Sequence, residues 1–113
     1  TGTALGTGSS NTDNIIAQAV AAGNNTLTSY AAGLARAHNG GGYNDWYLPS
    51  KDELNKLYLN RVAIGGFAND YYWSSSEYDA SSHSHAWFQH FGNAYQDGDF
   101  KYATRRVRAV RAF

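Results

Sequence analysis

Three of the four histidines, His83, His85 and His90, fall close together in the chain, and imidazole is a common ligand of metals in proteins. On an extended strand His83 and His85 would share one face, where their ring nitrogens could bind zinc or nickel. The chain has no cysteine, and no carboxylate stands at a recognised metal-ligand spacing from these histidines. We therefore predict no metal and no other cofactor, and interpret the histidines as residues of a polar surface loop.

A run of three serines ends at Glu77 and could suggest a serine nucleophile. Such a nucleophile needs a base beside it and, in hydrolases, a strained turn that exposes the hydroxyl. The sequence places neither a histidine–carboxylate pair nor such a turn around residues 74–76. We expect these hydroxyls to close backbone hydrogen bonds around Trp73. The missing cysteines also remove disulfides and thiolate chemistry, so we predict a non-enzymatic domain.

Aromatic residues make up 15% of the chain. The rings of Trp46, Trp73 and Trp87 could form a platform on which sugar rings stack. Large aromatic side chains are more often buried, where they contribute much of the packing energy of a small domain. We predict that the three tryptophans pack in the core.

The charges are unevenly distributed, although the formal net charge is zero. Residues 1–100 carry four basic and nine acidic groups, whereas residues 101–113 carry five basic groups and no acidic one. The neutral total argues against a general nucleic-acid or membrane binder. No apolar run approaches the ~18–20 residues that a membrane span needs, so we predict no direct membrane insertion.

The first half of the chain has helical patterns that would support these side chains. Capping residues at 11–13 precede an apolar helical face, and Gly23 supplies a stop. Residues 28–37 form a second, alanine-rich helical segment with Leu34 on its apolar face. The three glycines at 40–42 then predict a turn.

A third helix carries the clearest local signal. Ser50 and Glu53 have the spacing of a capping box. Leu54 and Leu57 follow on one face, and glycines at 65–66 end the segment.

Helical periodicity disappears after residue 66. Residues 71–73, 86–91 and 106–110 are aromatic or β-branched and predict short strands. The polar stretches at 77–85 and 92–100 predict loops between them. The chain is therefore predicted to be one α+β domain spanning residues 1–113. Because it begins in a segment rich in glycine, threonine and serine, we expect it to be the C-terminal part of a longer protein.

Several segments occur in a familiar order, namely residues 6–12, 45–54, 72–77, 86–87 and 106–111. Together they resemble the family of the C-terminal domain of Lcl, a collagen-like bacterial adhesin. This resemblance implies a C-type-lectin-like fold related to formylglycine-generating enzymes. Two or three short helices would pack on a small, twisted, mostly antiparallel sheet, with long loops forming the ligand face.

Two departures from the wider fold limit what the resemblance implies. Formylglycine-generating enzymes use a cysteine pair, which this chain lacks. Calcium-dependent lectins carry a proline-containing loop for calcium and sugar, whereas the sole proline here is Pro49, preceded by Leu48. The resemblance therefore implies a fold that displays loops to a ligand. It does not imply that this chain catalyses a reaction.

Residues 78–105 resemble the variable region of a diversity-generating retroelement protein, in which template adenines are rewritten. In the resembling family many of these positions are asparagine, and replacing only adenines in AAC and AAT reaches every residue here outside the framework. That framework consists of Ala86, Trp87, Gln89, Phe91, Gln96, Lys101 and Thr104. The glutamines and the lysine fit the scheme awkwardly, because their codons also contain adenine.

The variable positions would form a binding surface rich in tyrosine, serine, aspartate and histidine, which are residue types that antibody loops also use. We predict that tyrosine and phenylalanine anchor the ligand while the polar residues tune specificity. The predicted ligand-binding residues are Tyr78, Asp79, Ser81, Ser82, His83, Ser84, His85, Phe88, His90, Asn93, Tyr95, Asp97, Asp99, Phe100, Tyr102 and Arg105.

The resulting hypothesis is a non-enzymatic ligand-binding or adhesion domain on the surface of a bacterium or phage, for example at a pilus tip. Its partner would be a protein or glycan on another cell or host surface, not a nucleic acid, and its oligomeric state is open. The alternative is a fixed adhesin that binds sulfated polysaccharide through its C-terminal arginines. Those arginines could instead pair with acids such as Asp45, Asp52 or Glu77, and we favour this structural role.

Overall fold

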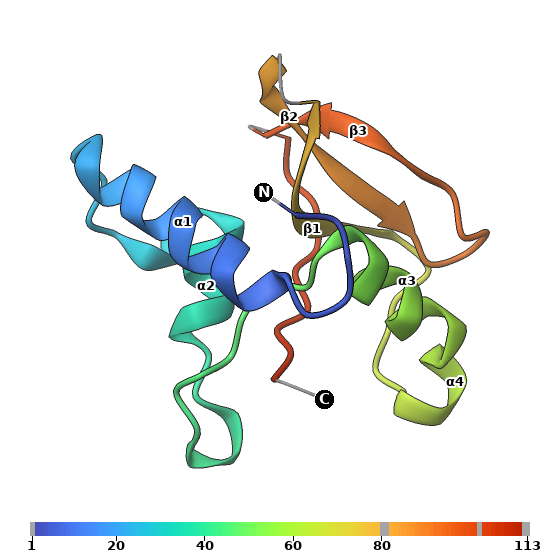
Figure 1. Ribbon diagram of the computed structural model, residues 1–113. Coiled ribbons are helices and arrows are strands. Elements are labelled where there is room, and N and C mark those ends of the chain that lie inside the picture. Colours follow the sequence, from blue (N-terminus) through green and yellow to red (C-terminus); the bar gives the residue numbers. More distant parts are fainter. Residues whose placement is uncertain (1, 80–81, 102, 112–113) are drawn as a thin grey trace.

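A computed structural model describes residues 2–79, 82–101 and 103–111 and shows helices packed on a small sheet (Figure 1). The helical elements, in chain order, are α1 (Gly8–Ala21), the 3-10 turn η1 (Leu27–Ser29), α2 (Ala31–Ala37), the 3-10 turn η2 (Gly40–Gly42), α3 (Lys51–Leu59) and α4 (Arg61–Ile64). The strands are β1 (Tyr71–Asp79), β2 (Ser82–His90) and β3 (Gln96–Phe100). This arrangement confirms the predicted α+β class.

The capping box predicted for the third helix is confirmed at the start of α3. The Ser50 hydroxyl accepts the backbone N–H of Glu53, and the Glu53 carboxylate accepts the backbone N–H of Ser50 at 2.8 Å. The predicted cap of the first helix is wrong, since α1 already begins at Gly8. Asn11 is used differently, because its buried amide donates to the carbonyl of Gly2. Thr12 accepts the backbone N–H of Leu48 at 3.0 Å.

The second predicted helix is divided. Residues 27–29 form a 3-10 turn, and α2 begins only at Ala31. Gly33 packs so closely on the carbonyl of Leu27 that a Cβ atom there would overlap it. Ala32 and Ala35 are buried, whereas Leu34 is exposed, contrary to its predicted place on the apolar face.

The sheet has the order β1-β2-β3, and both pairings are antiparallel. Two predicted loops were wrong: residues 77–85 contain the end of β1 and the start of β2, and residues 92–100 contain β3. Polar residues suit these strands because an antiparallel sheet can keep one face in solvent. The predicted strand at 106–110 makes only isolated bridges, from Arg106 to Tyr72 and from Val110 to Tyr47.

The sheet separates two apolar clusters, since neighbouring residues of a strand point to opposite faces. Tyr72 belongs to the first cluster, which consists of Tyr47, Leu54, Leu57, Tyr72, Phe91 and Val110. Trp73 belongs to the second, which consists of Ala32, Ala35, Leu48, Trp73 and Phe88. Accordingly α1 and α2 lie on one side of the molecule in Figure 1, and α3 and α4 on the other.

The prediction that the three tryptophans pack in the core is fully confirmed for Trp73 alone. Trp73 is buried, and its indole N–H donates to the carbonyl of Ala103. Trp46 and Trp87 are only half-buried. Each of these two therefore presents part of its ring at the surface.

The serines that follow Trp73 have the structural role predicted for them. The Ser74 hydroxyl donates to the carbonyl of Trp87 at 2.7 Å. The Ser76 hydroxyl donates to the carbonyl of Gly2 at 2.7 Å and accepts the backbone N–H of Lys51 at 2.9 Å. These bonds tie β1 to the N-terminal segment and to α3.

Replacing Ser50 with alanine is expected to destabilise the domain. The fully buried hydroxyl caps α3 and also donates to the carbonyl of Ala4 at 2.9 Å. Loss of such a cap costs about 1–2 kcal/mol, which corresponds to several degrees in Tm for a domain of this size. Thermal unfolding followed by circular dichroism measures the effect. Ser10→Ala removes an exposed hydroxyl as the control, and equal Tm values for the two variants would contradict the assigned role.

Candidate functional site

The end of the sheet where β1 and β3 finish and β2 begins projects beyond the helices (Figure 1). One face of this end carries four rings, which we call the outer aromatic patch: Tyr78, His85, Trp87 and Phe100. The centroids of His85 and Phe100 are 4.2 Å apart, and those of Tyr78 and Trp87 are 4.6 Å apart. The rings of all three strands thus form one continuous surface.

A glycine allows the patch to form. Gly98 is the cross-strand partner of Trp87, and the ring of Tyr78 lies directly over it. A Cβ atom at this position would overlap that ring, so any other residue would displace Tyr78. Lys51 covers another part of the patch, with its ammonium 4.1 Å from the centre of a Trp87 ring.

Exposed rings distinguish the patch from the core. Tyr78 retains 41% of its accessible surface and Phe100 retains 42%. Aromatic side chains of this size bury apolar area when a partner covers them and lose little rotamer freedom in doing so. The patch therefore has the chemistry of a contact surface for a protein or a sugar.

The opposite face of the sheet carries His90, Asp97 and Asp99, and Tyr95 and Arg105 contact these residues from beside the strands. We call this second group of predicted residues the polar face: His90, Tyr95, Asp97, Asp99 and Arg105. The Tyr95 hydroxyl donates to the carboxylate of Asp97 at 2.5 Å. This hydrogen bond, followed by that from the backbone N–H of Gly98, holds the pKa of Asp97 below its ordinary value. The same contact raises the pKa of Tyr95.

Tyr71 underlies the polar face. Its ring meets that of His90 edge-on, with centroids 4.5 Å apart. The guanidinium of Arg105 lies 5.0 Å from the centre of the Tyr71 ring and forms an ion pair with Asp99 at 2.5 Å. The contacts fix the direction of both charged groups, so the polar face presents a defined hydrogen-bonding pattern.

The structure does not bring all predicted residues to these surfaces. Phe88 lies on the same face of the sheet as its partner Asp97, but it is buried in the second apolar cluster beside Trp73. Asn93 is exposed in the turn before β3.

Other predicted residues are described only in part. Asp79, Ser82, His83 and Ser84 lie on β1 and β2 by their backbone alone. Ser81 and Tyr102 lie outside the described residues.

The two glutamines that we interpreted as framework have a structural role. Gln89 is fully buried and donates to the side chain of Asn55 on α3 at 3.0 Å. The amide of Gln96 reaches Gln89 at 3.4 Å and the carbonyl of Lys51 at 3.3 Å. These amides join β2 and β3 to α3, which explains why they differ in type from the surrounding residues.

Most basic residues of the C-terminal segment are paired with acids, as the favoured interpretation predicted. The pairs join Lys101 to Glu77, Arg105 to Asp99, Arg106 to Asp70 and Arg111 to Asp45. The pKa of Asp45 is lowered first by its hydrogen bonds from Arg111. The predicted partner Asp52 lies instead in the first turn of α3.

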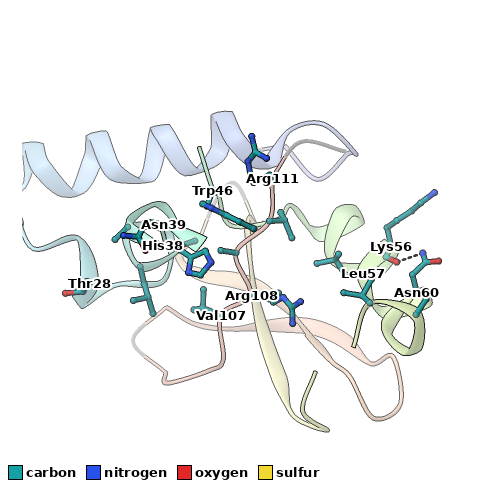
Figure 2. A pocket seen from close by; sticks show the side chains of 17 residues that line it. Thr28, His38, Asn39, Trp46, Lys56, Leu57, Asn60, Val107, Arg108 and Arg111 are labelled. Atoms are coloured by element: carbon teal, nitrogen blue, oxygen red, sulfur yellow. Dashed lines mark hydrogen bonds between the residues drawn. The ribbon is translucent and has the colours of Figure 1, made fainter. Parts of the chain in front are cut away.

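Sequence reasoning missed a groove of about 1260 Å³ beside the C-terminal segment. Figure 2 shows His38 and Trp46 on one side, Lys56 and Leu57 on the other, and Arg108 between them. These residues come from segments far apart in the chain, so no local pattern could have brought them together. Within the described residues, no cluster of three or more histidines and carboxylates could hold a metal ion.

The chain belongs to the Lcl C-terminal domain family, whose sequence model matches residues 8–111. The resemblance inferred from residues 6–12, 45–54 and 106–111 is thus confirmed at the level of the family. A comparison with curated proteins finds no match. In the described part of the chain, no helix has the length and apolar character needed to cross a membrane.

Changing Tyr95 to phenylalanine is expected to raise the pKa of Asp97 toward its ordinary value, because the main hydrogen bond to the charged form is removed. The carboxyl carbon shift of Asp97, followed by NMR between about pH 2 and 6, a range that brackets an ordinary aspartate, measures this change. Asp70 is the internal control, since its lowered pKa depends on Tyr71 and Arg106. An unchanged titration of Asp97 would show that Tyr95 is not its donor.

Proposed function

We propose that the domain is a non-enzymatic ligand-binding or adhesion module of a bacterial or phage surface, and that residues 78–105 are its diversified segment. The observation that carries this proposal is the outer aromatic patch, whose exposed rings lie on the projecting end of the sheet. The predicted variable residues His90, Asp97 and Asp99 of the polar face lie on the same sheet. Membership of a family described by the C-terminal domain of Lcl supports an adhesion role.

The arrangement of framework and variable residues also supports the proposal. Within the same segment, Gln89 and Phe91 are buried, whereas Tyr78, Tyr95 and Phe100 are exposed. Exposed side chains can be exchanged at small cost in stability, while buried ones cannot. A sequence diversified at the exposed positions would therefore still fold, and sister copies would bind different proteins or glycans. The C-type-lectin-like fold remains a prediction. It fits a sheet whose exposed side chains vary between copies while its buried ones stay the same.

The gene and its neighbourhood test the diversification directly. We expect a template repeat that matches the codons of residues 78–105 and differs from them only at adenines, beside a reverse transcriptase gene. The substitutions should fall at positions such as Tyr78, Tyr95 and Phe100, and should spare the codons of Gln89 and Gln96. Absence of a repeat, or mismatches at bases other than adenine, would reject diversification while leaving a fixed binding surface possible.

A fixed adhesin that binds sulfated polysaccharide is the second candidate. The observation that favours it is Arg108, to which the described residues supply no carboxylate partner. Its guanidinium instead donates to the carbonyls of Gly65 and Gly66 and lies 4.4 Å from the centre of the Phe67 ring. The pairing of Arg105, Arg106 and Arg111 with acids weakens this candidate.

Heparin affinity chromatography separates the two candidates. The adhesin hypothesis expects salt-sensitive retention that Arg108→Ala and Arg111→Ala reduce, because sulfate binding depends on ionic contacts. Arg36→Ala is the matched control, since Arg36 already pairs with Asp13 on α1. The diversification hypothesis expects no retention, and retention that both C-terminal variants leave unchanged would place the heparin site elsewhere.

A further inference from the structure

Lys51, the first residue of α3, places its ammonium over the ring of Trp87 in the outer aromatic patch. The rings of the patch contact one another in the order Trp87, Tyr78, His85 and Phe100. Successive centroids in this order are 4.6, 6.4 and 4.2 Å apart. The patch is therefore a row of rings with a positive charge beside its first member.

Backbone contacts hold Lys51 in this position. Its N–H donates to the Ser76 hydroxyl on β1 at 2.9 Å, and its carbonyl accepts the side-chain amide of Gln96 on β3 at 3.3 Å. The capping box of Ser50 and Glu53 orders the helical turn that begins at Lys51. Among these partners only Gln96 lies in the diversified segment, and we interpret it as framework. Lys51 would therefore keep its place when the variable side chains change.

The charge of Lys51 is available to a ligand. Among the described residues, no carboxylate forms an ion pair with its ammonium. Asp52 follows it in the chain but is exposed, and Glu77 on β1 and Asp99 on β3 are each paired with another basic residue. The ring of Trp87 attracts the ammonium without cancelling its charge. A carboxylate brought by a partner would complement this cation.

The tilt of the rings favours a protein ligand over a sugar. The ring of Tyr78 is tilted by 48° to that of Trp87 and by 49° to that of His85. The rings of His85 and Phe100 are tilted by 40°. A sugar ring stacks on a flat aromatic face, and these rings share no common plane. Apolar side chains of a protein can pack into such an uneven surface, as aromatic residues at protein interfaces commonly do.

We propose that Lys51 and the outer aromatic patch bind a protein segment that carries an acidic side chain beside apolar ones. The carboxylate meets the ammonium of Lys51, and the apolar side chains cover the exposed rings of Tyr78 and Phe100. This inference rests on the proposed function, in which Tyr78, His85 and Phe100 vary while Trp87 is framework. Sister copies would then share the requirement for an acidic group and differ in the apolar side chains that they accept.

Selection from a displayed library of random peptides, with the whole domain immobilised, tests the proposal. We expect the bound peptides to be enriched in aspartate or glutamate next to aromatic residues or leucine. Lys51→Gln should remove the enrichment in acidic residues and keep that in apolar ones, because the rings remain. Lys56→Gln is the matched control and should select the same peptides as the unchanged domain. Lys56 is exposed on the same helix, and the described contacts place its ammonium over none of the four rings.

Fluorescence anisotropy with the most enriched peptide measures the contribution of each side chain. Lys51→Gln should weaken binding about three- to fivefold, since one partly exposed ion pair is lost. Tyr78→Ala should weaken it at least as much, because an exposed ring leaves the surface. Lys51→Gln keeps the hydrogen bonds to Ser76 and Gln96, which use the backbone of residue 51. Thermal unfolding of each variant checks that it is folded.

The results distinguish this inference from the proposed function. Binding that Tyr78→Ala weakens and Lys51→Gln leaves unchanged would overturn the role of Lys51 while the binding surface stands. Peptides whose affinity neither variant changes would bind elsewhere, which would overturn both proposals. A library that yields no binding peptide would overturn the protein ligand proposed here and leave the surface to a glycan.

Discussion

The buried carboxylate of Glu53 connects parts of the chain that would otherwise have no common support. One of its oxygens accepts the backbone N–H of Ser50, and the other accepts the Tyr47 hydroxyl at 3.2 Å and the backbone N–H of Gly6 at 3.2 Å. Because burying a carboxyl group is costly unless its oxygens are hydrogen-bonded, these contacts favour bringing the three segments together at the start of α3. Burial and the nearby carboxylate raise the pKa of Tyr47 to about 12, which keeps its hydroxyl a donor.

The hydrogen bond between Glu53 and Tyr47 also helps to position other parts of the molecule. Tyr47 pairs in both directions with Val110, so the position of α3 also determines the path of the C-terminal segment. That path forms the floor of the groove, while the glutamines joined to Asn55 and Lys51 hold β2 and β3 against the same helix. One helix therefore supports both the sheet and the C-terminal segment.

The features predicted correctly from sequence are local, or they depend on residue types that have a strong structural preference. The capping box depends on two residues three positions apart, so its signal lies within one helical turn. β3 was missed because its residues, Gln96 to Phe100, include a glycine and two aspartates and gain their strand conformation only from pairing with β2. The burial of Phe88 was missed because it comes from contact with Trp73, its partner on a strand distant in the sequence. The groove depends on contacts between distant segments, which no single-sequence pattern contains.

The acidic composition of β3 has a consequence for how copies of the domain meet. β3 pairs only with β2 within the described sheet, so its other side is an edge that could pair with an identical strand. The carboxylate of Asp97 would then approach a strand of the same charge, and the repulsion opposes such pairing, whereas Asp99 is already paired with Arg105. The lowered pKa of Asp97 keeps that carboxylate charged to a lower pH than an ordinary aspartate would allow. An aspartate that shapes the polar face thus also disfavours pairing of the domain with copies of its own sheet.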